Sequence, residues 1–264
     1  MALRIGVAGC SGRMGRQLLK YIHEAPECLL VSGTVSPGSA HQGADLGELG
    51  GFQKMGLFAH TICEDLFECS DVVIDFTKPT ATVQHAICTH RYRTPLVIGT
   101  TGLTEEDRQV IEEASHNAAI VMSPNMSVGI TLLRLLIERS ASILDDNFDI
   151  EVVDFHHRHK IDTPSGTALS LIKSAVRGRG GSDYENYIRH YQGPRPRGAI
   201  GLSVLRGGHI VGEHSVQFIS DGELLELRHS AFDRSIYVKG AIKAAFWVYD
   251  REPGLYSMQH VLGL

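Results

Sequence analysis

The sequence predicts an α/β protein of two domains, and three observations lead to this prediction. The chain has 264 residues, of which 43% are hydrophobic, enough to bury a substantial core. In the first half, short apolar runs suited to buried strands alternate with helical segments, which is typical of a parallel sheet. After Ser127 a long helix is followed mainly by strands with short turns. We therefore expect a first domain over residues 1–127 plus 236–264, and a mixed α+β domain over residues 128–235.

The chain begins with a strand, a glycine-rich turn and a helix. The apolar run Ile5-Gly6-Val7-Ala8 leads into Gly9-Cys10-Ser11-Gly12-Arg13-Met14-Gly15, and residues 16–22 have helical spacing. Glycines in such a turn let a pyrophosphate approach the beginning of the helix. The spacing G-x-x-G-x-x-G is a variant of the usual motif, and a glycine-rich turn alone is weak evidence. Its position between a strand and a helix predicts a Rossmann-like dinucleotide-binding domain.

Polar loops follow the other strands predicted in the first half. We expect strands at about 28–35, 71–76, 95–98 and 118–122, a helix at about 80–90, and a second helix opened by the near capping box Thr104-Glu105-Glu106-Asp107. In open parallel sheets, ligands bind beyond the carboxyl ends of the strands. The loops at Gly9, Thr77, Gly99 and Ser123 leave strands at that edge. Each could be an ordinary turn, but together they favour contact with a cofactor.

The second half is predicted to have a different organisation, without regular βα alternation. Its expected elements are a helix over 128–144, a strand over 148–155, a helix from Ser165 or Gly166 to about Val176, and strands over 199–205, 212–219 and 223–229. A last apolar helix, at about 235–249, is expected to return to the first domain.

The strongest indication of function is the run His156-His157-Arg158-His159-Lys160, followed by Asp162-Thr163-Pro164-Ser165-Gly166-Thr167. So many cations and titratable rings repel one another, and a small substrate with several negative charges would hold them together. Imidazole exchanges protons near neutral pH, and an ammonium can donate one. A helix beginning after Pro164 would add backbone N–H groups that favour a carboxylate or phosphate. The run predicts an anion-binding site equipped for proton transfer.

Two other interpretations of this run are weaker. A nucleic-acid surface is disfavoured because the chain has a net charge of −5 and no basic stripe elsewhere. A metal site is disfavoured because Arg158 and Lys160 interleave with the histidines and would oppose a divalent cation, and no H-E-x-x-H motif is present. We expect neither nucleic acid nor a bound metal.

The end of the second predicted strand bears on the choice of cofactor. An Asp or Glu there usually holds the ribose 2′-hydroxyl of NAD, but this chain has Thr34-Val35-Ser36-Pro37. Ser36 could donate a hydrogen bond to a 2′-phosphate and Arg13 could supply charge, although Ser36 could equally be a turn residue. The sequence favours NADPH, or the acceptance of both NADPH and NADH.

Apolar runs and cysteines favour a soluble cytoplasmic protein without membrane contact. The longest apolar runs, such as residues 130–137, are too short to cross a bilayer, and a strand so near the N-terminus leaves no room for a signal peptide. The five cysteines show no C-x-x-C pair, which suits reduced thiols. Cys10, in the predicted cofactor turn, is expected to be a small packed residue, with a reactive thiol as the alternative.

Six motifs extend over nearly the whole chain: Val7-Ala8-Gly9 through Gly12-Arg13-Met14-Gly15, Asp75-Phe76-Thr77, Gly99-Thr100-Thr101-Gly102, His156-His157-Arg158-His159-Lys160, Pro164-Ser165-Gly166-Thr167-Ala168 and Val211-Gly212-Glu213-His214. In these motifs the chain resembles the dihydrodipicolinate reductases of the diaminopimelate–lysine pathway. The resemblance implies transfer of a hydride from NADPH or NADH to a cyclic unsaturated imine dicarboxylate, with protonation of the neighbouring carbon. The implied product is tetrahydrodipicolinate.

The resemblance also implies roles for individual residues. His156 is expected to be the catalytic acid/base and Lys160 the proton donor, while His157, Gly166 and Thr167 would hold the substrate carboxylates. The expected cofactor contacts, with Ser36 added from the argument above, are Gly9, Cys10, Ser11, Gly12, Arg13, Met14, Ser36, Gly99, Thr100, Thr101, Ser123, Pro124, Asn125 and Met126. Many family members have an acidic residue where this chain has Val35-Ser36, so a cofactor preference does not carry over.

The strands of the second domain also bear on assembly. In runs such as Leu202-Ser203-Val204-Leu205, apolar side chains point to both faces of the strand. A small domain with one layer of helices cannot cover both faces of such a sheet. We expect a neighbouring subunit to cover part of this sheet, and the resemblance implies a homotetramer built through the second domain. The alternative is that residues 128–144 and 178–197 cover the sheet within one chain.

Two other function classes remain open at this point. A two-domain dehydrogenase acting on an amino-acid semialdehyde would have the same first domain but no use for the His-Arg-Lys run. A non-enzymatic nucleotide sensor would keep the Gly9–Gly15 turn but would not need a proton donor such as Lys160.

Overall fold

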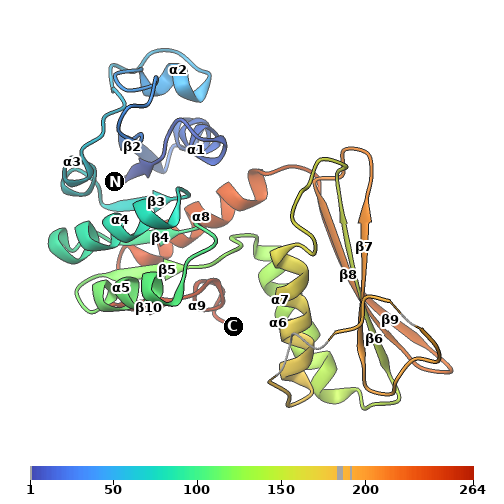
Figure 1. Cartoon of the computed structure of the whole chain (residues 1–264). Coiled ribbons are helices and arrows are strands. Elements are labelled where there is room, and N and C mark those ends of the chain that lie inside the picture. Colours follow the sequence, from blue (N-terminus) through green and yellow to red (C-terminus); the bar gives the residue numbers. More distant parts are fainter. Residues whose placement is uncertain (1, 183–186, 191) are drawn as a thin grey trace. The chain divides into compact units, whose positions relative to one another are not determined.

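A computed structural model describes residues 2–182, 187–190 and 192–264 of the chain. The structure divides into two compact units, Met1–Met126 with Tyr237–Leu264, and Ser127–Ile236 (Figure 1). Each junction lies one residue from the domain boundary expected from the sequence. None of the helices in the described ranges is long and apolar enough to cross a membrane.

The first unit is built on a sheet of six parallel strands in the order β10-β5-β4-β3-β1-β2. The strands are β1 (Leu3–Ala8), β2 (Cys28–Gly33), β3 (Val72–Asp75), β4 (Leu96–Ile98), β5 (Ala119–Met122) and β10 (Gly254–Tyr256). The chain goes outward from β1 to β2 and then returns to the other side of β1 to form β3. The strand order therefore switches between β1 and β3, which is where ligands bind in open α/β sheets.

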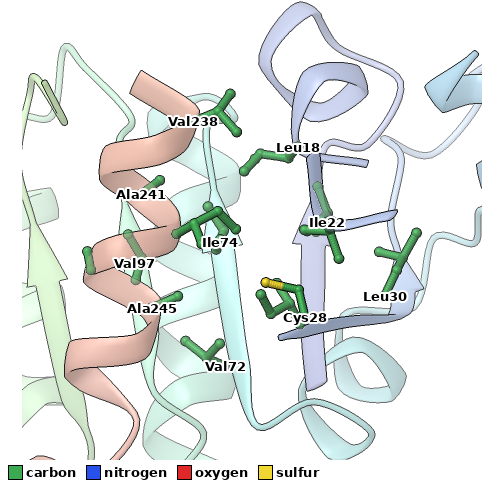
Figure 2. Packing of buried hydrophobic residues seen from close by; sticks show 14 of the residues in the cluster. Leu18, Ile22, Cys28, Leu30, Val72, Ile74, Val97, Val238, Ala241 and Ala245 are labelled. Carbon is green, nitrogen blue, oxygen red and sulfur yellow. The ribbon is translucent and has the colours of Figure 1, made fainter. Parts of the chain in front are cut away.

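Helices cover both faces of this sheet because both sets of alternating side chains are apolar. On one face lie α1 (Arg13–Glu24), α2 (Leu46–Gly50), α8 (Ser235–Val248) and α9 (Met258–Leu262); on the other lie α3 (Cys63–Glu68), α4 (Pro79–Tyr92) and α5 (Glu105–Ser115). Figure 2 shows Leu18 and Ile22 of α1, and Ala241 of α8, packed around Ile74 of β3. Val73, the neighbour of Ile74, belongs to the core on the opposite face. The expected Rossmann-like fold of the first domain is confirmed.

The second unit contains a four-stranded sheet in the order β7-β6-β8-β9. Its elements are α6 (Val128–Ile143), β6 (Asp149–His156), α7 (Gly166–Gly178), β7 (Ile200–Arg206), β8 (Gly212–Ile219) and β9 (Leu224–Ala231). The helices α6 and α7 pack on one face, where Ile150 and Val152 of β6 are buried. Because side chains alternate along a strand, Asp154 and His156 point to this same buried face.

The structure also differs from the sequence-based predictions in places. As expected, the second domain is mixed and has no regular βα alternation, although β6, α7 and β7 form one parallel β-α-β unit that was not predicted. Four short elements, α2, α3, β10 and α9, were not predicted, because three to six residues are too few to show a helical or strand period. The capping box between Thr104 and Asp107 is present as expected. Strand β2 ends at Gly33, before the predicted end, so Ser36 lies in the following loop.

Candidate active site

The turn between β1 and α1 depends on glycine at two positions. Gly9 has a φ of 68°, and a Cβ at this position would lie 2.7 Å from Cγ2 of Thr77. A Cβ at Gly15 would lie 2.2 Å from the carbonyl oxygen of Gly9, so the first turn of α1 packs directly on the loop backbone. Gly12 caps the helix, and Arg13, its first residue, is exposed. The turn thus presents the N-terminus of α1 to solvent, an arrangement that suits a pyrophosphate.

Side chains around this turn have distinct surroundings. Cys10 is fully buried, and burial raises the pKa of its thiol to about 11, so it is a packed residue rather than a reactive thiol. Met14 packs against the core. Nε of Arg16 donates to the carbonyl of Ser11 at 2.9 Å, and its Nη2 lies 3.3 Å from Nε2 of His41. Arg16 and His41 therefore add basic groups beside the turn, which the sequence argument did not include.

A buried carboxylate, Asp75 at the end of β3, joins the loops that follow β3 and β4. Its oxygens accept hydrogen bonds from the backbone N–H (2.7 Å) and hydroxyl (2.6 Å) of Thr77 and from the Thr100 hydroxyl (3.4 Å). Nδ1 of His85, on α4, lies 2.8 Å from the other oxygen. Burial raises the pKa of Asp75, but the contacts with His85 and Thr77 outweigh it and hold that pKa below its ordinary value. The carboxylate is therefore charged at neutral pH and organises this edge of the sheet.

The loops after β4 and β5 complete the same edge. A Cβ at Gly99 would overlap the ring of Phe76, so only glycine fits there. Thr101 is exposed, and the hydroxyl of Ser123 donates to the carbonyl of Asn125 at 2.8 Å. The residues at the carboxyl ends of β1, β4 and β5 are Gly9, Cys10, Ser11, Gly12, Arg13, Met14, Gly99, Thr100, Thr101, Ser123, Pro124 and Asn125. Met126 differs from them because its side chain is buried in the core, and Ser36 is exposed in the loop beyond β2.

In the second unit, Asp154 is the centre of a buried polar cluster. Its carboxylate accepts hydrogen bonds from the backbone N–H (3.0 Å) and hydroxyl (2.8 Å) of Ser165 and from Nη2 of Arg206 (3.2 Å). Nδ1 of His156 lies 2.9 Å away and Nδ1 of His214 lies 3.5 Å away. The cluster joins the ends of β6, β7 and β8 to the beginning of α7, and it fixes which ring nitrogen of His156 faces the carboxylate.

The charges within this cluster depend on burial. Burial raises the pKa of Asp154, but the His156 imidazole and the two Ser165 donors outweigh it and hold that pKa far below its ordinary value. Burial lowers the pKa of His214 to about 4, so this ring is neutral at neutral pH. The rings of His156 and His214 lie edge to face with centroids 5.1 Å apart. The ionised carboxylate of Asp154 thus lies beside His156, while the imidazole of His214, the other histidine next to this carboxylate, remains uncharged.

The loop after β6 holds the remaining cations of the run. Nζ of Lys160 lies 2.7 Å from each carboxylate oxygen of Asp162, and its backbone N–H donates to the carbonyl of His157 at 3.2 Å. The backbone N–H of Arg158 donates to the carbonyl of Gly208 at 3.3 Å, which joins this loop to the one before β8. Burial, followed by the neighbouring cations, lowers the pKa of His157. Asp162 was not predicted as a partner of Lys160, although it lies two residues further along the chain.

Helix α7 begins directly after this loop in the sequence. Ser165 caps the helix, and its hydroxyl oxygen accepts from the N–H of Ala168 at 3.1 Å. Gly166 and Thr167 take the first two helical positions, where the helix dipole favours an anion. A Cβ at Gly166 would meet no atom within 4 Å, so the space beside the helix end is open. The predicted residues His156, His157, Lys160, Gly166 and Thr167 therefore belong to one loop and its two flanking elements.

One group of potential metal ligands occurs in the described residues, formed by Asp154, His156 and His214, whose ligand atoms lie within 4.8 Å of one another. The carboxylate of Asp154 already accepts from Ser165 and from the cationic Arg206, which would oppose a divalent ion. We interpret the group as a hydrogen-bonded charge cluster, and the expectation of no metal stays a prediction.

Sequence reasoning missed three members of this cluster, Asp154, Arg206 and His214. The spacing of Asp154 and His156 could have indicated the first, because residues i and i+2 of a strand share a face. His214 lies in the motif Val211-Gly212-Glu213-His214, but without a structure nothing connects that strand to β6.

Two family models match the chain, "Dihydrodipicolinate reductase, N-terminus" over residues 3–126 and "Dihydrodipicolinate reductase, C-terminus" over residues 129–262. The chain belongs to the dihydrodipicolinate reductase family. Curated relatives agree with this assignment. A 4-hydroxy-tetrahydrodipicolinate reductase from Rhizobium rhizogenes is 45% identical over 267 residues, which cover 100% of this chain and 97% of the relative. One from Dinoroseobacter shibae is 46% identical over 263 residues, with 98% of both chains covered.

Solved structures show the same fold. A dipicolinate-bound dihydrodipicolinate reductase from Paenisporosarcina sp. TG-14 has a TM-score of 0.76 at 23% identity, with 97% of this chain and 98% of that chain covered. An amine dehydrogenase from Mycobacterium smegmatis has a TM-score of 0.61 at 12% identity, with 98% and 95% covered. Because such different dehydrogenases share the fold, the fold by itself does not select among activities; membership of the dihydrodipicolinate reductase family does.

Proposed function

We propose that this chain catalyses the NAD(P)H-dependent reduction of 4-hydroxy-tetrahydrodipicolinate (dihydrodipicolinate) to tetrahydrodipicolinate in diaminopimelate and lysine biosynthesis. The observation that carries the proposal is the cluster at the end of β6, where His156 lies on an ionised, buried Asp154 beside the loop of Lys160. A nucleotide sensor has no use for such a cluster. A semialdehyde dehydrogenase would not need so many cations, because its substrate has fewer carboxylates.

The proposed substrate is a dicarboxylate, and its two negative charges suit the residues around α7. One carboxylate would be held by the first residues of α7, Gly166 and Thr167, where the helix dipole favours an anion and the space beside Gly166 is open. His157, in the preceding loop, would bind the same substrate. Its lowered pKa makes it a hydrogen-bond donor rather than a fixed charge at neutral pH.

Protonation of the substrate carbon is assigned to Lys160 and His156. The Asp162 carboxylate, 2.7 Å from Nζ, orients the Lys160 ammonium, which would donate the proton as the hydride arrives. His156 would act as the acid/base group, with Asp154 fixing the orientation of its ring and balancing its charge when it is protonated. Asp154 and Asp162 are thus positioning residues for the two proton-transfer groups.

The dinucleotide supplies the hydride when it is bound, and the edge of the first sheet would hold it. The pyrophosphate would bind at the turn of Gly9, where there is no room for a Cβ, and at the open N-terminus of α1. Loops Gly99–Thr101 and Ser123–Met126 would line the rest, with Met126 contributing only main-chain atoms because its side chain is buried.

The residues that follow the second strand suggest that the enzyme uses NADPH at least as well as NADH. Ser36 is exposed there, and the basic side chains of Arg13, Arg16 and His41 belong to the adjoining turn, helix and loop. Ser36→Asp should repel a 2′-phosphate and raise the KM for NADPH about tenfold relative to that for NADH. Ser142→Asp, at an exposed position in the second unit, is the control. A wild-type enzyme that strongly prefers NADH would contradict the assignment.

One assay tests the proposed reaction. Oxidation of NADPH and of NADH is followed with the pathway intermediate generated enzymatically in the cuvette, and in parallel with aspartate semialdehyde alone. We expect turnover only with the intermediate. Turnover with the semialdehyde would instead support a semialdehyde dehydrogenase, and no turnover with either would support a sensor.

The second unit also supports a homotetramer. Its helices α6 and α7 cover one sheet face, whereas on the opposite face Leu205 and Leu224 are 48% and 56% exposed. The alternative is that a segment of the same chain covers this face. It has some support, because Nε of Arg195 lies 3.0 Å from a carboxylate oxygen of Asp149 on that face. Light scattering should give a mass near four times 28.9 kDa, and a mass near 28.9 kDa would refute the assembly.

A cytoplasmic location is part of the same proposal. All five cysteines are free thiols, which supports a reducing compartment. Fractionation of cells with an antibody to the protein should recover it with soluble cytoplasmic markers, and recovery with the membrane or an extracellular fraction would contradict this.

A further inference from the structure

Two of the cysteines form a close pair that the proposed reaction does not use. Cys63 is the first residue of α3 and Cys88 lies on α4, and their Sγ atoms are 2.7 Å apart. Both belong to the core between the outer helices and the sheet, in which Cys88 is buried and Cys63 is half-buried. A disulfide has a length of about 2.0 Å, so a shift of less than about 1 Å would bring the two atoms to bonding distance.

The two thiols have opposite acidities. The hydrogen bond with Cys63 lowers the pKa of Cys88, against the effects of burial and of the nearby Glu64, and His85 and Arg91 lower it further. The same hydrogen bond raises the pKa of Cys63 well above its ordinary value, and burial adds to this. Within the pair, Cys88 is therefore the more acidic thiol and the one that forms a thiolate more readily. A thiolate beside a thiol is the arrangement in which oxidation ends in a disulfide rather than in higher oxides.

Other cysteines in the chain lack these features. Burial raises the pKa of Cys10 and of Cys28 to about 11, so both remain thiols at neutral pH. Cys69 is half-buried, and its sulfur lies 3.7 Å from the carbonyl oxygen of Leu66 and 4.0 Å from the hydroxyl of Ser70. Among the five cysteines, only the pair on α3 and α4 places two sulfurs within reach of each other, and the pKa of one of them is lowered, so it is the place where we expect oxidation.

We propose that Cys63 and Cys88 are a peroxide-sensitive modification site that forms a reversible disulfide between α3 and α4. The Cys88 thiolate attacks one oxygen of hydrogen peroxide, the O–O bond breaks, and a sulfenic acid and hydroxide form. The Cys63 sulfur then attacks the Cys88 sulfur, the S–O bond breaks, and the hydroxyl group leaves as water. In total the two thiols lose two electrons and two protons, and one peroxide becomes two waters. A dithiol reductant reverses the step by thiol–disulfide exchange.

The site lies in the first unit and is independent of the proposed reductase activity. The full chain is reduced, freed of reductant and treated with hydrogen peroxide, and its free thiols are counted after denaturation. We expect the count to fall from five to three, the intact mass to fall by two hydrogens, and a Cys63–Cys88 cross-linked peptide to appear in a non-reducing digest. Dithiothreitol should restore all five thiols.

Single variants separate the roles of the two cysteines. Cys63→Ser should gain one or two oxygens at Cys88 without a cross-link, whereas Cys88→Ser should keep its remaining thiols under the same treatment. Cys69→Ser, the matched control, should still form the Cys63–Cys88 link. Five unreacted thiols in the wild-type chain, a cross-link that includes Cys69, or oxidation of Cys63 in Cys88→Ser at the wild-type rate would each overturn the proposal.

Discussion

Both units contain a fully buried aspartate next to the Nδ1 atom of a histidine, at 2.8 Å for Asp75 and His85 and at 2.9 Å for Asp154 and His156. In both, burial opposes the charge on the carboxylate and local donors outweigh it, so the pKa of each aspartate lies below its ordinary value. Each also accepts a backbone N–H and a hydroxyl from one residue, Thr77 in the first unit and Ser165 in the second.

The two pairs differ in what surrounds the histidine. His85 lies within α4, and its aspartate joins the loops of Thr77 and Thr100, so the pair organises the backbone of the loops that we propose as cofactor contacts. His156 ends β6 and is followed directly by the cationic loop, with Arg206 and His214 on the same aspartate. A buried Asp–His pair is therefore not a sign of catalysis by itself. In the proposed mechanism, the groups around the histidine decide whether it holds a loop, as His85 does, or transfers a proton, as we propose for His156.

The largest expected difference is between the two histidines. His156→Ala should lower kcat about a hundredfold or more because it removes an acid/base group, and Lys160→Ala should do the same, with little change in cofactor binding. His85→Ala should instead raise the KM for NAD(P)H and leave kcat within a few-fold of wild type. Steady-state kinetics with the cofactor concentration varied measure both kcat and the KM for NAD(P)H. Unchanged turnover in His156→Ala or Lys160→Ala would remove the role assigned to that residue.

The next effect concerns pH and stability in the second unit. The folded pKa of His214, about 4, is below the value of 6.5 for an unperturbed histidine, so unfolding takes up a proton between these values. The contribution of His214 to the free energy of unfolding is complete above about pH 6.5 and declines as the pH falls toward 4. Between pH 7 and pH 5 the loss should be about 2 kcal/mol. The contribution of Asp154 is lost only below the ordinary pKa of a carboxyl group, because its folded pKa is lowered.

Urea unfolding at pH 7 and pH 5 measures this loss. His214→Gln should show a smaller decrease in the free energy of unfolding than wild type, and His116→Gln, at an exposed position, should behave like wild type. Equal pH dependence in wild type and His214→Gln would show that the His214 ring is not kept neutral by burial.

The smallest expected effects come from the two aspartates. Asp154→Asn should lower kcat about tenfold, because His156 loses the charge that orients it, while the KM for NAD(P)H stays near wild type. Asp75→Asn should raise the KM for NAD(P)H about tenfold, with a smaller change in kcat. The pH profile of kcat should shift in Asp154→Asn only. If both variants change the same kinetic parameter, the two pairs have the same role and the comparison fails.

Much of this protein follows from local sequence. The Gly9–Gly15 turn, the capping box at Thr104 and the apolar alternation predicted the Rossmann-like sheet, because strands, turns and caps depend on neighbouring residues. The run from His156 to Thr167 predicted an anion site for the same reason, since its cations and helix beginning are contiguous. The family resemblance in these motifs is confirmed by the matches over residues 3–126 and 129–262.

Tertiary structure alone decided which distant residues support these motifs. Arg206 and His214 reach Asp154 only because β7 and β8 flank β6 on its two sides, a strand order that no local period encodes. Cys63 and Cys88 meet only because α3 packs on α4. The short elements α2, α3, β10 and α9 form for the same reason, since segments of three to six residues gain their stability from packing against the rest of the fold rather than from their own sequence.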